Sequence, residues 1–237
     1  MNKLVIDNNI ESSDIVIDTD SDLIVDLSNT SKNLTIHIMQ GVCVRGFVTA
    51  FSTSNNIKYL IDENCDIIIN KLAVDSSDNI TINLNDNNSK IDYHTSVINY
   101  CDNNYKQELN HNSSNTQSKI INHCINVEDS SFKFIVDGVI KKNLEEVKLS
   151  QDNRIINLRN GKSNILPNLL VDSDDVEASH AAYIGTFNED EKFYMMSRGL
   201  TLKECDDLLI KAFLLNNMNL SEKERNIYCS IIEKINK

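Results

Sequence analysis

The sequence predicts a mainly β protein that ends in a short α-helical tail. Two observations support this fold class. From residue 3 to about residue 185, apolar and polar residues alternate with period two, as in half-buried strands. After Gly185 the apolar residues recur at helical spacing instead. We therefore expect a β core over residues 1–186, followed by a helical region over residues 187–237.

The alternating segments are short and are separated by polar turns. Clear examples are NLTIHIM at residues 33–39, NITINL at 79–84 and FKFIVDG at 132–138. The chain contains one proline, Pro167, and six glycines. Asn, Asp and Ser must therefore form most of the turns, which they can do through local side-chain hydrogen bonds. No long segment with helical spacing interrupts this region, which argues against a βαβ architecture.

Two all-β architectures fit this pattern, a sandwich of two sheets and a parallel β-helix. Asparagine-rich turns and β-branched strands favour the β-helix, because stacked coils tolerate polar side chains at each corner. No strict repeat length is visible in the sequence. The polar stretch at residues 99–119 is expected to be an ordered crossover, either a loop or an exposed pair of strands, because apolar strands flank it closely.

The C-terminal tail carries explicit helix signals. The segment NEDEKFYMMSRG at residues 188–199 starts acidic, as a helix N-terminus favours, and Gly199 can end that helix. Capping boxes follow at Thr201–Glu204 and Ser221–Glu224. Apolar stripes after these boxes predict a helical hairpin whose core residues are Leu202, Cys205, Leu208, Leu209, Ala212 and Phe213, then Ile227, Tyr228, Ile231, Ile232 and Ile235.

Composition restricts the partners and the compartment. With 23 basic and 35 acidic residues, the formal net charge is -12, which repels phosphate backbones, so we expect no nucleic-acid partner. No apolar run is long enough for a signal peptide or a membrane span, so we expect a cytoplasmic protein without a membrane partner. Six scattered cysteines without a CxxC pair are expected to be buried small apolar residues.

No catalytic constellation is visible. The chain lacks a G-x-x-x-x-G-K-[ST] phosphate loop, so any use of ATP would belong to another subunit. His94, His111 and His123 have neither HxH nor HxxxH spacing, which argues against a zinc site. We therefore expect a protein that is not an enzyme. A β-helix enzyme acting on polysaccharide is the alternative, although aromatic residues for sugar stacking make up only 6% of the chain.

The segment at residues 168–214 resembles the C-terminal core of the SufB/SufD family of iron–sulfur cluster assembly proteins. A weaker likeness extends upstream to about residue 90. The likeness follows an ordered series of motifs: the acidic pair Asp174–Asp175, Ser179–His180, Gly185, Phe193–Tyr194, Ser197–Arg198–Gly199 and Ala212–Phe213. The resemblance implies a right-handed parallel β-helix, and a compact member that lacks the N-terminal helical region of larger ones.

The resemblance also implies partners and site residues. It implies a non-catalytic scaffold that docks a SufC-like ABC-type ATPase through its C-terminal helices and pairs with a SufB/SufD-like subunit or with itself. His180 becomes a candidate residue for contact with a transient iron–sulfur cluster. The candidate partner-binding residues are Phe193, Tyr194, Arg198, Gly199, Leu209 and Phe213.

The sequence departs from the family at the positions that supply ligands. Ala178, Ala181 and Asp152 stand where family members carry Cys, Glu and Cys. Because iron–sulfur ligation relies mainly on thiolates, we expect no cluster to be bound stably by this chain alone. A degenerate SufD-like subunit with a purely structural role is therefore a further alternative.

Each candidate also has a simpler structural explanation. A regular strand would place His180 on one apolar face with Val176, Ala178, Ala182 and Ile184, as a core or interface histidine. Phe193 and Tyr194 could pack the first tail helix onto the β core, and Arg198 could offset a helix dipole.

Overall fold

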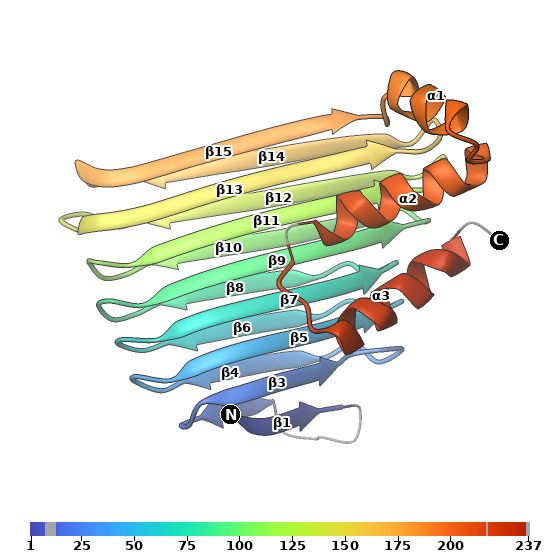
Figure 1. The fold of residues 1–237 in the computed structure, drawn as a ribbon. Coiled ribbons are helices and arrows are strands. Elements are labelled where there is room, and N and C mark those ends of the chain that lie inside the picture. The colour runs from blue at the N-terminus through green and yellow to red at the C-terminus, as the bar shows by residue number, and fades with distance from the viewer. Residues whose placement is uncertain (8–12, 217, 236–237) are drawn as a thin grey trace.

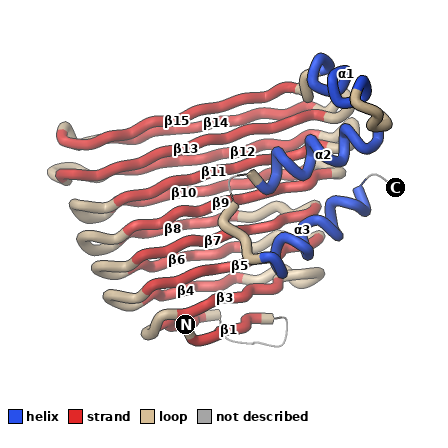
Figure 2. The backbone as a smooth tube through the Cα atoms, in the orientation of Figure 1, coloured by secondary structure: helices blue, strands red, loops and turns tan. Residues whose placement is uncertain are grey.

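The computed structural model describes residues 1–7, 13–216 and 218–235, and these form fifteen strands followed by three helices (Figures 1 and 2). The odd-numbered strands form sheet A: β1 (Asn2–Ile6), β3 (Ser21–Asp26), β5 (Cys43–Phe51), β7 (Asp66–Val74), β9 (Lys90–Asn99), β11 (Gln117–Asn126), β13 (Glu145–Asn157) and β15 (Asp175–Gly185). The even-numbered strands form sheet B: β2 (Asp14–Ile17), β4 (Asn33–Ile38), β6 (Asn56–Ile61), β8 (Asn79–Leu84), β10 (Asn103–His111), β12 (Ser131–Ile140) and β14 (Lys162–Val171).

Consecutive strands belong to opposite sheets, and all the pairings within each sheet are parallel. The chain therefore climbs as a stack of coils, each of which contributes one strand to each sheet (Figure 1). The prediction of a parallel β-helix with a C-terminal helical tail is confirmed, and the β-sandwich is excluded.

The coils lengthen along the chain. Val44 pairs with Ile67 one coil later, a separation of 23 residues, whereas Ser118 pairs with Leu149 across 31 residues. This gradual change explains why no strict repeat length is visible in the sequence. It also explains the polar stretch at residues 99–119, which contains strand β10 in the middle of sheet B and the start of β11, and is not an exposed crossover.

Asparagines form many of the corners, as the scarcity of glycine and proline predicts. Asn64, Asn88 and Asn115 occupy one stacked corner with φ values of 59°, 59° and 55°, in line with Gly41 at 74°. Asparagine tolerates this left-handed region better than most side chains. On sheet B, Asn56 Nδ2 donates to Asn33 Oδ1 at 2.7 Å, so asparagine side chains also bridge neighbouring coils.

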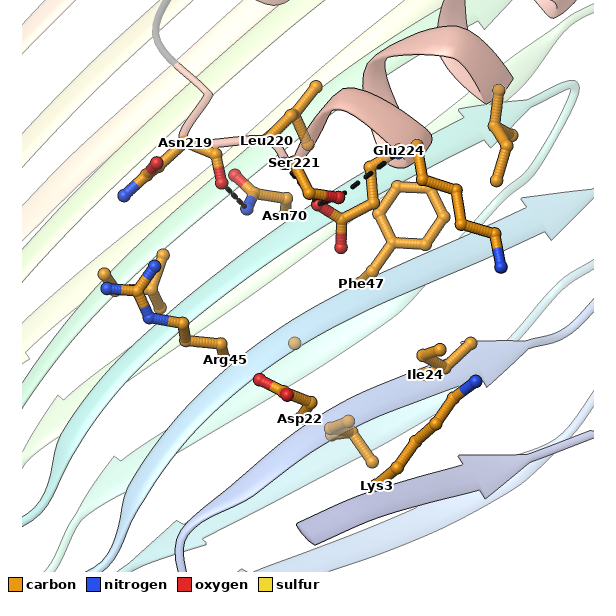
Figure 3. A pocket seen from close by; sticks show the side chains of 15 residues that line it. Lys3, Asp22, Ile24, Arg45, Phe47, Asn70, Asn219, Leu220, Ser221 and Glu224 are labelled. Atoms are coloured by element: carbon orange, nitrogen blue, oxygen red, sulfur yellow. Dashed lines mark hydrogen bonds between the residues drawn. The ribbon is translucent and has the colours of Figure 1, made fainter. Parts of the chain in front are cut away.

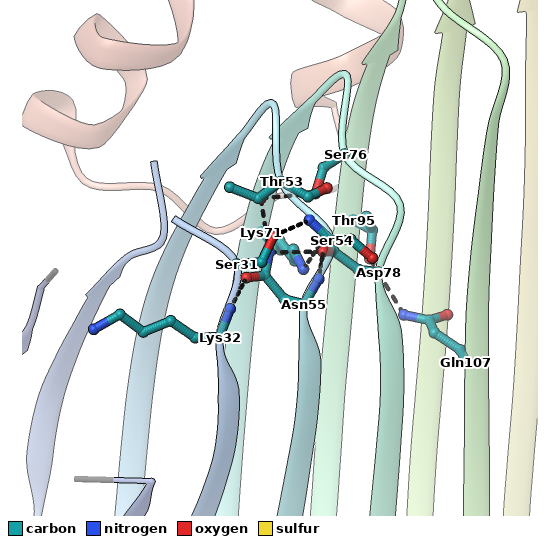
Figure 4. Close-up of polar contacts among 10 residues, drawn as sticks. All are labelled: Ser31, Lys32, Thr53, Ser54, Asn55, Lys71, Ser76, Asp78, Thr95 and Gln107. Carbon is teal, nitrogen blue, oxygen red and sulfur yellow. Dashed lines mark hydrogen bonds and ion pairs between the residues drawn. The ribbon is translucent and has the colours of Figure 1, made fainter. Parts of the chain in front are cut away.

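The interior of the β-helix is mostly apolar, but it contains a buried ion pair. Lys71 and Asp78 are both fully buried, and Lys71 Nζ lies 2.5 Å from Asp78 Oδ2 (Figure 4). Asp78 Oδ1 accepts hydrogen bonds from the backbone N and the Nδ2 of Asn55 at 3.0 and 2.8 Å. Burial lowers the pKa of the Lys71 ammonium, and the Asp78 carboxylate opposes that shift.

The three helices follow sheet A: α1 (Glu189–Ser197), α2 (Leu202–Leu215) and α3 (Glu222–Ile235). Helices α2 and α3 lie on the outer face of sheet A and share a second apolar core with it (Figure 2). Ser96 Oγ donates to the Leu214 carbonyl at 2.7 Å. Tyr228 is fully buried and meets the Phe47 ring edge-on at 5.6 Å. None of the helices in the described ranges is long and apolar enough to cross a membrane.

The predicted helix starts are confirmed, but the apolar stripe on α2 is rotated. Both capping boxes are formed, with Glu204 Oε2 accepting from Thr201 N and Glu224 Oε2 accepting from Ser221 N at 2.7 Å each. The residues buried on α2 are Cys205, Ile210, Leu214 and Leu215.

Leu202 and Leu208 are instead 51% and 49% exposed, and Ala212 is exposed as well. Helix α2 has more apolar residues than one face can hold, so the sequence pattern allows two faces and packing against sheet A selects one. On α3, Tyr228 and Ile232 are buried as predicted, Ile231 is half-buried and Ile227 is 36% exposed. The side chain of Ile235 lies outside the described residues.

Candidate functional site

The β-helix ends openly at its last coil. β14 and β15 are the final strands of their sheets, so each has one edge without a neighbouring strand (Figure 1). Apolar side chains are exposed on these strands: Leu170 is 59%, Tyr183 50% and Ile184 43% exposed. An open sheet edge with exposed apolar side chains is typical of a surface that pairs with another chain.

His180 lies in this last coil. It is the register partner of Gln151 in β13, and Val176 and Ala178 on the same face of β15 pack partly against the interior core. His180 itself is exposed, because no later coil covers it. It shares the predicted strand face but is not a core histidine of this chain.

Three buried amide side chains lie beneath His180, and we call them the amide cluster: Asn122, Gln151 and Asn153. Asn122 Nδ2 donates to Asn153 Oδ1 at 2.8 Å. Among the residues that the structure describes, four amide atoms have no hydrogen-bond partner: Gln151 Oε1 and Nε2, Asn153 Nδ2 and Asn122 Oδ1. A buried polar atom left without a partner costs about 1–3 kcal/mol, so water or another group is expected to satisfy them.

The amide cluster was not predicted from the sequence. The period-two reading assigns polar residues to the outer face and to turns, whereas Gln151 and Asn153 continue the inward positions of Val147 and Leu149 in β13. The alternation of inward and outward positions along β13 was the one feature of the sequence from which their inward orientation could have been predicted.

The three positions that depart from the family pattern lie at the same end. Asp152 is the register partner of Ala181 and points to the face opposite Gln151. Its carboxylate accepts hydrogen bonds from Arg154 Nε and Nη2 at 2.8 and 2.9 Å, and this pairing raises the pKa of Arg154. Ala178 is half-buried and Ala181 is exposed.

Thiols do not gather around His180. Cys65, Cys124 and Cys205 are buried as predicted, and burial raises the pKa of the Cys124 thiol. Cys43 and Cys101 are exposed, contrary to the prediction, because Cys43 is an outward position at the start of β5 and Cys101 lies in the turn after β9. Among the described residues, no group of three or more His, Cys, Asp or Glu side chains could hold a metal ion. A single exposed imidazole does not form a ligand set for a stably held cluster.

Helix α1 presents an exposed apolar surface, which we call the aromatic patch: Phe193, Tyr194 and Met196, which are 75%, 60% and 45% exposed. No residue of α1 is buried. Packing onto the β core therefore does not explain this pair of aromatic residues.

Arg198 and Gly199 shape the break after α1. The Arg198 guanidinium lies 5.2 Å from the centre of the Tyr194 ring, and its Nη2 donates to Tyr194 Oη at 3.2 Å. Gly199 has a φ of 98°, the left-handed conformation that lets the chain turn from α1 into α2. Leu209 of α2 is half-buried and lines a shallow cavity of about 410 Å³ together with Tyr194 and Met195.

Phe213 has a different environment from the other candidate partner-binding residues. Its ring stacks on His123 with centroids 4.5 Å apart, and His123 Nδ1 lies 2.7 Å from the Phe213 carbonyl oxygen. Burial lowers the pKa of His123, so the neutral ring donates this hydrogen bond. Phe213 therefore anchors α2 to sheet A. Tyr194 contacts Arg198 and shares a cavity with Leu209, and Gly199 follows Arg198 at this α1–α2 corner. Phe193 is exposed on α1 beside Tyr194.

Comparison with known proteins gives a consistent assignment. Residues 60–213 match the family described as SUF system FeS cluster assembly, SufBD core domain. The chain is 29% identical over 117 residues to the iron–sulfur cluster assembly protein SufD of Bacillus subtilis, an alignment that covers 49% of this chain and 27% of that protein. It is 34% identical over 99 residues to the protein ABCI7, chloroplastic, of Arabidopsis thaliana, covering 40% of this chain and 21% of the relative.

A third relative is an iron–sulfur cluster assembly SufBD family protein of Pyrococcus horikoshii. It is 44% identical over 48 residues, which cover 20% of this chain and 11% of that protein. The chain thus spans about a quarter or less of the length of these relatives. The family match runs from β6 to α2, so it contains the open end, the amide cluster and the aromatic patch.

Proposed function

The chain belongs to the SufBD core family of the SUF system for iron–sulfur cluster assembly, and on this premise we propose that it is a non-catalytic subunit of a SUF-type assembly complex. In this proposal α1 and α2 dock a SufC-like ABC-type ATPase, and the open end of the β-helix pairs with a second subunit. The observation that carries the proposal is the aromatic patch on a helix that buries no residue of its own.

The composition of α1 suits a docking helix. Aromatic side chains supply large contact areas and dominate many protein interfaces. Asp190 and Glu191 line the same shallow cavity as Tyr194, so the apolar surface has an acidic rim. A partner with basic residues around an apolar recess would complement both features.

The open end suits a second β-helix subunit, either a SufB/SufD-like protein or another copy of this chain. The free edges of β14 and β15 offer backbone N–H and C=O groups to a partner strand. Pairing there would enclose His180, and the partner could supply donors and acceptors to the amide cluster.

A cluster would be cargo at this interface. This chain contributes one imidazole, and the thiolates on which iron–sulfur ligation relies would come from the partner subunit. If the partner supplies every ligand, the chain is a SufD-like subunit with a purely structural role. The residues at positions 152, 178 and 181, Asp, Ala and Ala, favour this alternative because none of them is a thiolate ligand.

The environment of His111, whose ring contacts two hydroxyl groups, is also consistent with a non-catalytic role. His111 Nδ1 lies 2.6 Å from Thr116 Oγ1, and its Nε2 lies 2.8 Å from Ser118 Oγ. The ring is fully buried, and burial lowers its pKa from 6.5 to about 4. A base that substrate cannot reach does not support catalysis. The proposed compartment is the cytoplasm, where reducing conditions keep cysteines free.

Co-purification tests the proposal. The chain is co-expressed with the SufC-like ATPase of its own organism and captured by affinity purification. We expect an equimolar complex from the wild type and its loss in Phe193→Ser/Tyr194→Ser. Val5→Ser/Val16→Ser is the matched control, because these valines are 47% and 61% exposed on β1 and β2, at the other end of the β-helix from α1. Failure of the wild type to capture the ATPase, or equal capture by the patch variant, would reject the proposal.

A further inference from the structure

A cavity of about 590 Å³ lies between the first coils of sheet A and the start of α3 (Figure 3). β1, β3, β5 and β7 form one wall, and residues 219–227 form the other. The cavity is remote from the open end and from α1, and most of its lining lies outside the family match. Its volume is within the range of about 300–1,000 Å³ that is usual for small-molecule sites.

The body of the cavity is apolar. Ile24, Phe47 and Ile68 come from sheet A, and Leu220 and Ile227 come from the α3 side. Phe47 is held by its edge-on contact with Tyr228, so this wall is fixed by the second core. An alkyl or aryl group bound here would be shielded from water by sheet A on one side and by the α3 segment on the other.

Three cations line the cavity: Lys3, Arg45 and Lys223. In the parts of the chain that the structure describes, none of them forms an ion pair, although the whole chain has a formal charge of -12. Two carboxylates also line it. Asp22 lies between Lys3 and Arg45 in register (Figure 3). Glu224 already accepts hydrogen bonds from Ser221 N and Oγ at 2.7 Å each. The lining thus has one excess positive charge, which fits a monoanion.

Asn70 adds a hydrogen-bonding requirement. It lines the cavity and is only 5% exposed. Its Nδ2 donates to the Asn219 carbonyl at 3.2 Å, whereas no donor within residues 1–7, 13–216 and 218–235 reaches its Oδ1. An occupant that carries an N–H or O–H group would supply the missing donor.

We propose that this cavity binds a monoanionic amphiphile: a small molecule with an apolar alkyl or aryl body, a carboxylate and an N–H donor, as in an N-acyl amino acid. The carboxylate pairs with Arg45, and the apolar body lies between sheet A and Ile227, while Lys3 and Lys223 also line the cavity. Because both walls contact the occupant, its binding holds α3 against the β-helix and raises the stability of the docked tail by mass action.

Calorimetric titration of the full chain with N-octanoylglycine tests this site, since the compound carries all three features. We expect saturable binding at one site, and binding about tenfold weaker for its uncharged methyl ester, as loss of one charge-assisted contact predicts. Arg45→Gln is expected to weaken binding of the acid by a similar factor. Lys58→Gln is the control, because Lys58 is an exposed lysine on β6 of the opposite sheet.

Both substitutions change exposed side chains, and unfolding curves followed by circular dichroism establish that the variants are folded. The proposal is overturned if the acid does not bind saturably, if the ester binds as tightly as the acid, or if Arg45→Gln and Lys58→Gln bind alike.

Discussion

His111 links the interior of the β-helix to pH. Its two ring nitrogens contact Thr116 and Ser118, and burial lowers its pKa from 6.5 to about 4. The unfolded chain therefore takes up a proton near pH 6.5, whereas the folded chain does so only near pH 4. The resulting stability is fully present above pH 6.5 and is lost progressively as the pH falls towards 4.

We expect this histidine to reduce the free energy of unfolding by about 3 kcal/mol across that pH interval. Urea unfolding of the wild type and His111→Gln at neutral pH and near pH 4 measures the effect. The stability of the variant should fall less than that of the wild type on acidification. Parallel losses in the two proteins would contradict this account of His111.

The buried pair Lys71–Asp78 gives a second prediction at the residue scale. Lys71→Met leaves the Asp78 carboxylate buried without its cation, which typically costs about 3–5 kcal/mol. Lys71→Met/Asp78→Asn removes both charges and keeps a side chain that can accept from Asn55, so it should be clearly more stable than the single variant. Urea unfolding compares them. A single variant as stable as the wild type would contradict the predicted cost.

Individual residues were predicted unevenly. The family likeness located His180 and the Phe193–Tyr194 pair, but not their exposure, which depends on whether another coil or helix covers them. The inward amides Gln151 and Asn153 were missed, because hydrophobic periodicity assigns inward positions to apolar residues. Only the stacking of neighbouring strands shows which way a polar side chain points.

At the scale of elements, the tail helices show what local signals can define. Capping is a short-range interaction, so both capping boxes could be read from four residues each. The buried face of α2 depends on sheet A, and the stripe containing Leu202 and Leu208 was therefore assigned to the wrong side. Strand β10 was missed for a related reason, because its inward residues include Gln107 and His111.

The capping box of α2 gives a measurable effect. Thr201→Ala removes the side-chain oxygen that accepts from Glu204 N and is expected to cost about 1 kcal/mol of helix stability. Hydrogen exchange of the amides in α2 reports the loss locally. Lys203→Ala, an exposed change in the same turn, is the control. Equal exchange rates in the two variants would show that the box does not stabilise α2.

At the scale of the whole molecule, the open end and the aromatic patch are both exposed apolar surfaces. Sequence periodicity predicted an all-β core, and the asparagine-rich turns and the family resemblance favoured stacked coils over a sandwich. The lengthening of the coils explains why no repeat length was visible in the sequence. Periodicity could not show which ends of the β-helix are covered by other segments, since that depends on packing between segments far apart in the sequence. The cavity beside α3 was missed for the same reason, because its walls lie far apart in sequence.

The open end predicts association. We expect the chain to form a dimer with itself or with a SufB-like subunit of the same organism, measured by sedimentation velocity. Tyr183→Lys/Ile184→Lys places charges on the exposed β15 and should leave the protein monomeric, because two charged residues would be desolvated in the interface. A wild type that stays monomeric alone and with that subunit would contradict the proposed pairing.

The central claim is that an ABC-type ATPase binds to the α1–α2 corner. Hydrogen exchange of the full chain, measured with and without the SufC-like ATPase, tests the location directly. The account predicts slower exchange in residues 189–215 on addition of the ATPase, with no change in strands β4 and β6. Unchanged exchange in α1 and α2, or protection confined to other coils, would contradict it.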